Sequence, residues 1–254
     1  MADTFIKLKD KKWLENQKVA GKCVRKILDN FTNTIKNANN IVVKDLELVS
    51  AMYFEQFDCR PTFLNYKGFP APVCISVNEI LVHGIADDYK LQPGDKISMD
   101  VGATHKGAIA DAATTVFFKD PPSEKAKRMV ELCEKALDAA IKAVEINKQI
   151  GIVGYTINNL VKNSEFGLIV EYGGHGIDTD KPHAQPFIVN KSQMSEGIRI
   201  QPGFTFAIEP MLVMTKDTST EILNDGWSVK TKTIGTHAEH TVFVTENGVE
   251  VITC

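Results

Sequence analysis

Apolar side chains recur at helical spacing in two pairs of segments, one pair in each half of the chain. Residues 9–36 and 44–58 form the first pair, and Pro61 follows the second of these segments. A proline disfavours helical geometry in the residue before it, so the second helix is predicted to end at this point. A longer helix is predicted from Ser123 to about Asn147, and a shorter one over 152–164. The chain therefore shows the order helix, helix, strands twice.

Short apolar runs between these helices predict strands. They are rich in β-branched and aromatic residues and are bounded by glycine, proline and asparagine, which is typical of strands and their turns. The runs are 73–77, 80–83, 97–101, 113–118, 167–172, 186–190, 204–215, 227–232, 239–245 and 248–253. No flexible linker separates the two halves. We expect a single α+β domain over 1–254, with halves of approximately 9–120 and 121–254.

Two aspartates lie in a predicted β-hairpin. Asp100 ends one apolar run and Asp111 opens the next, with a turn predicted around His105 and Lys106. If these two residues form the turn, Asp100 faces Asp111 directly. Like charges at such a position destabilise the pair unless they share a proton or a cation. The hairpin by itself leaves open whether the aspartates only flank a solvated turn.

A repeat favours a shared site over that alternative. Three features recur in the same order in both halves: a His-Gly-Ile, a Gln-Pro-Gly six residues before an acid, and a strand that begins near an acid. The matching pieces are His83–Ile85 and His175–Ile177, Leu91–Asp100 and Ile200–Glu209, and Ala110–Phe117 and Ala238–Phe243. Three echoes in order indicate a duplicated unit. Two related halves would bring their acids and histidines to one cleft.

Composition narrows the class of protein. The 254 residues carry a formal net charge of −3, with 43% hydrophobic and 24% charged residues, which is ordinary for a globular protein. That balance gives no electrostatic footprint for nucleic acid. The five cysteines are scattered and odd in number, and neither a signal core nor a membrane-spanning run is present. We expect a reduced, cytoplasmic protein.

The acids point to metal chemistry. Asp100, Asp111, Glu209 and Glu239 supply four negative charges, which two divalent cations would balance, and His175 adds an imidazole. Oxygen-rich ligation suits manganese, iron(II), cobalt or magnesium, with zinc also possible. In two-metal sites a shared water becomes a nucleophile and the scissile carbonyl is polarised. These five residues are therefore the candidate metal ligands.

The same motifs resemble a known family. From about residue 9 to its carboxyl end, the chain is similar to the methionine aminopeptidases of type I, within the pita-bread metallohydrolases (peptidase family M24). The motifs that carry the resemblance are Cys74–Ile85, Met99–Gly102, Gly174–Ile177, Ala207–Pro210 and Glu239–Thr241. The resemblance implies a pita-bread fold, in which two pseudo-symmetric halves share a central curved antiparallel sheet with flanking helices.

The resemblance also implies a role for each site residue. Asp100 and Asp111 would hold one metal, and His175 and Glu209 the other, with Asp111 and Glu239 bridging. Glu209 would act as general base, His83 would bind the substrate near the scissile nitrogen, and His183 would stabilise the oxyanion. The pocket for the methionine side chain would comprise Phe63, Tyr66, Phe69, Cys74 and Trp227.

Other histidines and one loop depart from the family pattern. His105 and His237 match no family position and are predicted to be exposed turn residues. His240 follows Glu239 directly, so strand alternation points it to the opposite face. The resemblance implies that the segment from Asp178 to His183 is one residue longer than its counterpart in the family.

The resulting prediction is an enzyme that removes the initiator methionine from new polypeptides with a small second residue. Expected partners are a peptide or nascent-chain substrate and, transiently, the ribosome, for a monomeric enzyme without nucleic-acid or membrane contact. Two alternatives remain. One is a hydrolase of Xaa-Pro peptides, although the 99 residues before Asp100 leave little room for the additional domain of those relatives. The other is a non-catalytic binding module with the same fold.

Overall fold

The first pair of helices agrees closely with the sequence pattern. The computed structural model describes residues 6–254; residues 1–5, where the sequence predicts no signal core, lie outside the described residues. Helix α1 spans Lys11–Asn37, and the carboxylate of Asp10 accepts a hydrogen bond from the Trp13 N–H at its first turn. Helix α2 spans Val43–Gln56.

The second pair of helices is shorter than predicted. Helix α3 spans Glu124–Ala143, with the Ser123 hydroxyl accepting from the Ala126 N–H, and α4 spans Ile152–Val161. The prediction carried the first of these to Asn147. Asn147 instead has a φ of 69°, a left-handed conformation that a right-handed helix cannot contain. The chain therefore turns before α4.

The strands form one large sheet and two small ones. Their bounds, with the 3-10 turn η1 at Tyr66–Gly68, are β1 Arg60–Pro61, β2 Cys74–Val77, β3 Ile80–Val82, β4 Lys96–His105, β5 Ala108–Phe117, β6 Gly167–Leu168, β7 Gly174–Asp178, β8 Lys181–Ile188, β9 Thr205–Ile208, β10 Met211–Val213, β11 Thr220–Ile222, β12 Val229–Thr231, β13 Gly235–His237, β14 Glu239–Thr245 and β15 Gly248–Val251. Within 6–254, nine strands make an antiparallel sheet in the order β1-β4-β5-β14-β9-β7-β8, with β2 beside β4 and β15 beside β14. The smaller sheets have the orders β13-β10-β6 and β11-β12-β3.

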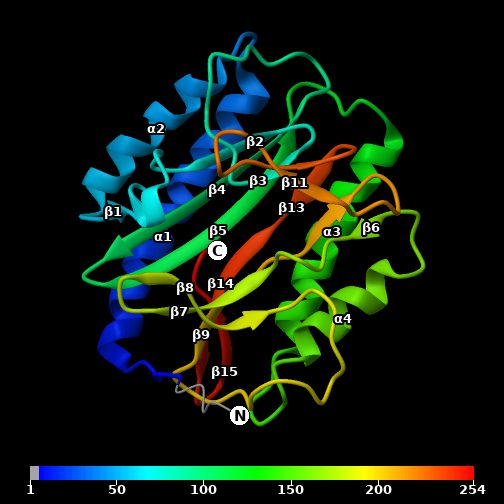
Figure 1. Ribbon diagram of the computed structural model, residues 1–254. Helices are drawn as coiled ribbons and strands as arrows, with labels where there is room; N and C mark the ends of the chain where they lie inside the picture. Colours follow the sequence, from blue (N-terminus) through cyan, green and yellow to red (C-terminus); the bar gives the residue numbers. More distant parts are fainter. Residues whose placement is uncertain (1–5) are drawn as a thin grey trace.

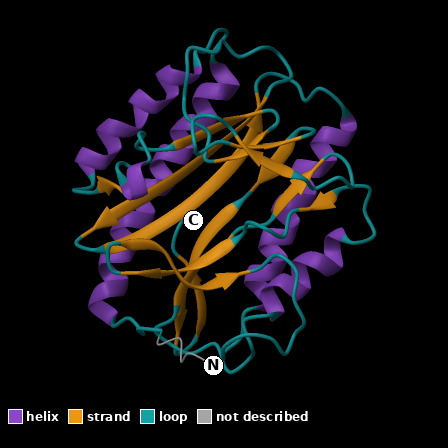
Figure 2. Cartoon of the chain, viewed as in Figure 1, coloured by secondary structure: helices purple, strands orange, loops and turns teal. Residues whose placement is uncertain are grey.

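The large sheet joins the two halves of the chain. Strand β5 of the first half pairs with β14 of the second, through Ala113 with Glu239 and Ala112 with His240. Helices α1 and α2 flank one side of the strands and α3 and α4 the other (Figures 1 and 2). This is the predicted pita-bread arrangement, a curved antiparallel sheet with flanking helices.

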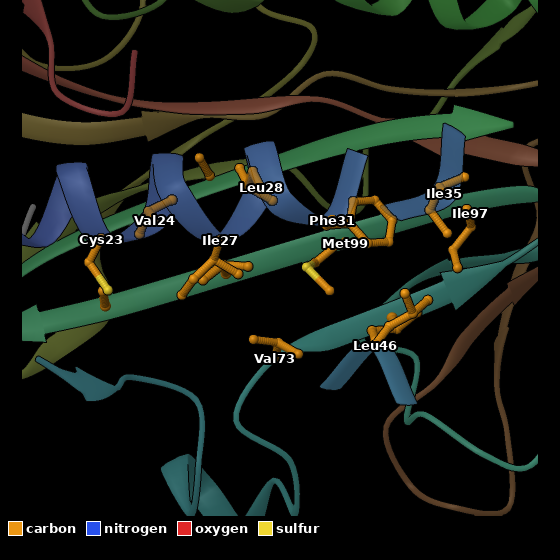
Figure 3. Packing of buried hydrophobic residues seen from close by; sticks show 14 of the residues in the cluster. Cys23, Val24, Ile27, Leu28, Phe31, Ile35, Leu46, Val73, Ile97 and Met99 are labelled. Carbon is orange, nitrogen blue, oxygen red and sulfur yellow. The ribbon is translucent and has the colours of Figure 1, made fainter. Parts of the chain in front are cut away.

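Each half has its own apolar cluster. In the first, α1 packs on β4 and β5: Ile27 and Phe31 lie beside Met99 (Figure 3). In the second, α3 packs on β9, β10 and β14, and α4 packs on α3 and β6. Two clusters joined by one sheet agree with a duplicated unit, and we propose on this basis that residues 9–120 and 121–254 are the two halves of one domain.

The predicted register of the central hairpin is wrong by one residue in its turn. Lys106 and Gly107 form the turn, with φ angles of 48° and 83°, so that Asp100 pairs with Ala113 and Asp111 with Gly102. A two-residue hairpin turn of this kind needs a positive φ at both positions, which Gly107 adopts without strain. The two aspartates are therefore diagonal neighbours on one face of the sheet, not directly opposed.

A lysine is buried next to this hairpin. Lys96 on β4 has no exposed surface, and its Nζ donates to the backbone oxygens of Ile80 and Ser76 at 2.9 and 3.2 Å and to the Ser98 hydroxyl at 3.4 Å. These bonds tie β4 to the β2–β3 segment that leads to His83. Burial lowers the pKa of Lys96 to about 7.

This shift predicts a pH-dependent stability. Between pH 7 and the lysine's ordinary pKa of 10.5, the unfolded chain binds more protons than the folded one, so the free energy of unfolding rises with pH over that range. Below pH 7 the buried Lys96 is charged, and its full desolvation cost lowers the free energy of unfolding. Above about pH 10.5 the lysine is neutral in both states, and this cost is zero. We expect Lys96→Met to flatten this rise in urea-unfolding series at pH 7, 8, 9 and 10. Substitution of the exposed Lys90 by methionine should leave it unchanged, and equal slopes in all three proteins would refute the prediction.

Candidate metal centre and adjoining cavity

Three carboxylates meet across three adjacent strands. Ala113 on β5 pairs with Asp100 on β4 and with Glu239 on β14, and Asp111 lies two residues away on the same face. Side chains of paired residues, and of residues two apart in a strand, share a face of the sheet. As a result, carboxylate oxygens of Asp100, Asp111 and Glu239 all lie within 4.8 Å of one another.

The fourth carboxylate, that of Glu209, lies where one pair of strands ends and the next begins. Strand β9 pairs with β14, with Ile208 opposite His240, and β10 pairs with β13, with Met211 opposite His237. The two pairs have the same register. Glu209 lies in the break between β9 and β10. Continuing the register places it beside Glu239, so the second half supplies two acids to the same point. The predicted continuous strand 204–215 is thus wrong: Pro210 follows Glu209, and a proline cannot donate a ladder hydrogen bond.

The candidate imidazole ligand is held in one orientation. Nδ1 of His175 lies 3.3 Å from the Gly176 carbonyl oxygen, and Nε2 faces the acids, 3.6 Å from Glu239 and 3.9 Å from Asp111. Burial lowers the pKa of His175 to about 4, so the ring is neutral at pH 7 and has a lone pair to give. An Nδ1–H bound to a carbonyl is the usual support for a metal-binding Nε2.

Glycines on both sides of His175 explain why β7 can approach its neighbours. A Cβ at Gly174 would collide with the Ala207 carbonyl oxygen, and one at Gly176 with that of Gln185. Only glycine fits at these two positions. The Gly-His-Gly sequence therefore lets the imidazole reach the acids from a strand packed closely between β8 and β9.

The four carboxylates are buried close together, so their negative charges repel one another and favour the binding of cations. Burial, followed by repulsion from the neighbouring acids, raises the pKa of Asp100 and Glu239 well above the ordinary value, and burial raises that of Asp111 to about 7. Burial, followed by repulsion from Asp111, also raises the pKa of Glu209 well above its ordinary value. Oδ1 of Asp100, Oδ1 of Asp111 and Oε1 of Glu239 are buried and have no hydrogen-bond partner within the described residues 6–254. Oxygen donors with unsatisfied lone pairs fit hard divalent ions, which would neutralise the repulsion.

A cavity of about 180 Å³ opens beside these acids. Its lining includes all five residues predicted for the substrate pocket, together with both candidate catalytic histidines and one metal-ligand candidate: Phe63, Tyr66, Lys67, Phe69, Cys74, His83, Asp100, His183 and Trp227. The far wall is apolar, with the Phe69 and Trp227 rings edge to face at 5.3 Å. One end of the cavity is therefore apolar, and the other leads to the carboxylates.

Both candidate catalytic histidines border the cavity on defined backbone features. His83 follows β3 with a φ of 57°, an uncommon conformation for a residue with a side chain that is often found at functional sites. Burial lowers its pKa. The His183 ring lies 4.5 Å from that of His175 and 5.4 Å from that of Tyr66. The segment after Asp178 is the turn between β7 and β8, and β8 brings His183 to this position.

Two histidines differ from the sequence prediction. His105 and His237 were expected in exposed turns, but they lie within β4 and β13 and are 7% and 1% exposed. Nδ1 of His105 lies 2.8 Å from the Asp58 carbonyl oxygen. His237 is grouped with Asp100 and Glu209, with donor atoms within 4.8 Å of one another. The period of two in a strand could have revealed this, since His237 stands two residues before Glu239.

His240, by contrast, points away from the acids as alternation predicted. Its Nδ1 lies 2.8 Å from the hydroxyl oxygen of Thr253, which follows β15. The two histidines flanking Glu239 therefore have different surroundings. Only His237 lies among the candidate ligands.

Comparison with known proteins gives a consistent result. Residues 15–246 match the profile of metallopeptidase family M24. The methionine aminopeptidase of Mycoplasma capricolum is 34% identical over 251 residues, which are 98% of this chain and 98% of that protein. The crystal structure of methionine aminopeptidase from Thermotoga maritima superimposes with a TM-score of 0.93 at 32% identity, covering 98% of this chain and 99% of that one.

A more distant likeness shows the fold alone. Prolidase from Pyrococcus furiosus has a TM-score of 0.78 at 20% identity, and the match covers 97% of this chain but 65% of the prolidase. Among the described residues, no helix is both long and apolar enough to cross a membrane.

Proposed function

This chain belongs to metallopeptidase family M24, and we propose that it removes the N-terminal methionine from peptides whose second residue is small. One observation supports this most strongly. The candidate ligands from both halves meet beside a cavity that Asp100 lines, that has an apolar wall and whose size suits one side chain. A free amino group and the scissile bond would then lie at the acids, with the first side chain in the cavity.

The residues have separate roles in this proposal. Asp100 and Asp111 would hold one divalent ion, His175 and Glu209 the other, and Asp111 and Glu239 would reach both. Such ions, when bound, polarise the scissile carbonyl and acidify water. Asp111 is less exposed than Asp100, and two hydrogen bonds to Thr241 fix its backbone. The Asp111 N–H donates to the Thr241 hydroxyl, and that hydroxyl donates to the Asp111 carbonyl oxygen.

The protein's own groups would then move protons and orient the substrate. Glu209 would take a proton from the attacking water and pass it to the leaving amine. His83 would bind the substrate near the scissile nitrogen, and His183 would donate to the developing oxyanion. Desolvation and the nearby His175 lower the pKa of His183 to about 3, so at pH 7 it would act as a neutral donor.

The test is a peptide panel assayed with added Mn(II) or Co(II). Release of the first residue from Met-Ala and Met-Gly peptides is the expected result, with far slower cleavage of Met-Leu and of Ala-Pro. Preferential cleavage of Ala-Pro would instead indicate a prolidase-like activity. No turnover of any peptide with any divalent metal would overturn the proposal and favour a binding module.

The aromatic wall predicts a change in specificity. Trp227→Ala removes one side of the cavity, so larger first residues gain room while methionine loses contacts. We expect the ratio of kcat/KM for Met-Ala over Phe-Ala to fall by about 10-fold or more, since a single methylene in an apolar pocket already changes selectivity by 10-fold to 200-fold. Both substrates are measured on the same variant, so partial unfolding lowers both rates and leaves the ratio unchanged. An unchanged ratio would place the first side chain elsewhere.

The cellular context is also a proposal. The net charge of −3 gives no general attraction to nucleic acid, and the five cysteines are free. The charge supports a contact with the ribosome that is only transient, and the free cysteines support a reducing, cytoplasmic environment; that the enzyme is a monomer is a further part of the proposal. Co-sedimentation with ribosomes at rising salt, together with the mass of the protein in solution, tests this.

A further inference from the structure

His237 is a buried polar side chain that the proposed mechanism does not use. It is 1% exposed, and neither ring nitrogen has a hydrogen-bond partner among residues 6–254. An unpaired buried polar group is destabilising, so a native structure rarely keeps one without a use. The groups around the ring indicate that use.

Backbone contacts of His237 fix its imidazole ring on the side of Glu209 and Glu239. His237 pairs with Met211 across the β10–β13 ladder, and its carbonyl oxygen accepts a hydrogen bond of 2.8 Å from the Thr115 hydroxyl on β5. Glu209 precedes Met211 by two residues, and Glu239 follows His237 by two. Alternation along both strands therefore places the imidazole on the side of the sheet that carries the carboxylates.

The surrounding donor atoms have the spacing of a coordination shell. A ring nitrogen of His237 and carboxylate oxygens of Asp100 and Glu209 all lie within 4.8 Å of one another. Ligand atoms on opposite sides of one ion, with bonds of about 2.0–2.4 Å, are separated by roughly 4.0–4.8 Å. The three atoms can thus surround a single cation. A nitrogen lone pair facing two carboxylates is repulsive unless a proton or a cation lies between them, and a divalent cation also offsets the charge of both acids.

We propose that His237 is an additional ligand of the metal centre, on the divalent ion held by Asp100. The inference rests on the proposed metal site and adds to it a second imidazole besides His175. A second nitrogen donor shifts the preference of the site from manganese and magnesium toward cobalt and zinc.

The direct test is the number of imidazoles bound to the metal. The full-length protein is loaded with two equivalents of Co(II), and X-ray absorption spectroscopy counts the histidine rings in the coordination shell. Two rings per chain are expected in the wild type, and one in His237→Gln. The matched control is His240→Gln, which removes the other histidine beside Glu239 and should retain two rings.

Calorimetric titration with Co(II) gives a second readout that does not depend on activity. Loss of even an outer-shell partner weakens metal binding by about 10-fold to 100-fold, so His237→Gln should weaken one of the two ions at least 10-fold. A single ring in the wild type, or equal affinities in wild type and His237→Gln, would overturn the inference. Since the wild-type ring count needs no variant, a folding defect in His237→Gln leaves the test intact. If methionine is still released while only one ring is bound, this inference fails and the proposed function stands.

Discussion

Replacing Asp111 by asparagine should abolish metal binding and activity together. Asp111 is 1% exposed and lies within reach of Asp100, Glu239 and His175, so its charge serves both proposed ions. Asparagine keeps the size and the backbone bonds to Thr241, but it removes one of the four negative charges. Since a metal contributes several kcal/mol to the transition state and each 1.36 kcal/mol is tenfold, we expect kcat/KM to fall about a thousandfold or more.

The measurement combines elemental analysis with the rate of methionine release. Asp88→Asn is the matched control, because Asp88 is exposed and lies outside the site. It should retain the wild-type metal content and rate. Full metal content in Asp111→Asn would show that this carboxylate is not a ligand, whatever the activity.

Replacing Glu209 by glutamine should separate proton transfer from metal binding. Glutamine is isosteric and keeps an oxygen that can coordinate, but it cannot accept the proton of the attacking water. General acid–base catalysis typically contributes 10²-fold to 10⁴-fold, and we expect kcat for Met-Ala to fall within that range. Metal content should fall much less than in Asp111→Asn.

Glu221→Gln is the matched control for that variant, since Glu221 is exposed on β11. It should behave as wild type in both measurements. A Glu209→Gln enzyme with near-normal kcat would assign the proton transfer to another group, and a complete loss of metal would make Glu209 chiefly a ligand.

The sequence predicted the elements whose period or order was strong. Helices α1 and α3 carry long amphipathic stripes, and Ser123 is a cap that the sequence predicts, so the extent of α1 and the start of α3 could be predicted. The repeated motifs predicted that Asp100, Asp111, Glu209 and Glu239 would meet, because duplicated halves place equivalent strands side by side. The four residues do come together across β4, β5, β14 and the β9–β10 break.

The sequence could not predict features that depend on the backbone conformation of one or two residues. The hairpin turn falls on Lys106-Gly107 because both residues adopt a positive φ, and the pattern of apolar residues could not distinguish this turn from one a residue earlier. Strand β7 was not predicted, since Gly174 and Gly176 have low strand propensity and are present to let strands approach. The sequence predicts a turn at His237 because the residues 235–237 carry no apolar run, and its spacing of two from Glu239 is the one signal that points to a strand, which the pairing of β13 with β10 confirms.

The most direct test of the whole account is a titration of the metal-stripped protein with Mn(II) or Co(II), with methionine release from Met-Ala measured at each addition. The account predicts that binding saturates at two ions per chain, that activity appears with them, and that a chelator removes both. Binding of no divalent ion, or activity that persists unchanged after chelation, would contradict the claim that acids from the two halves form a shared metal centre.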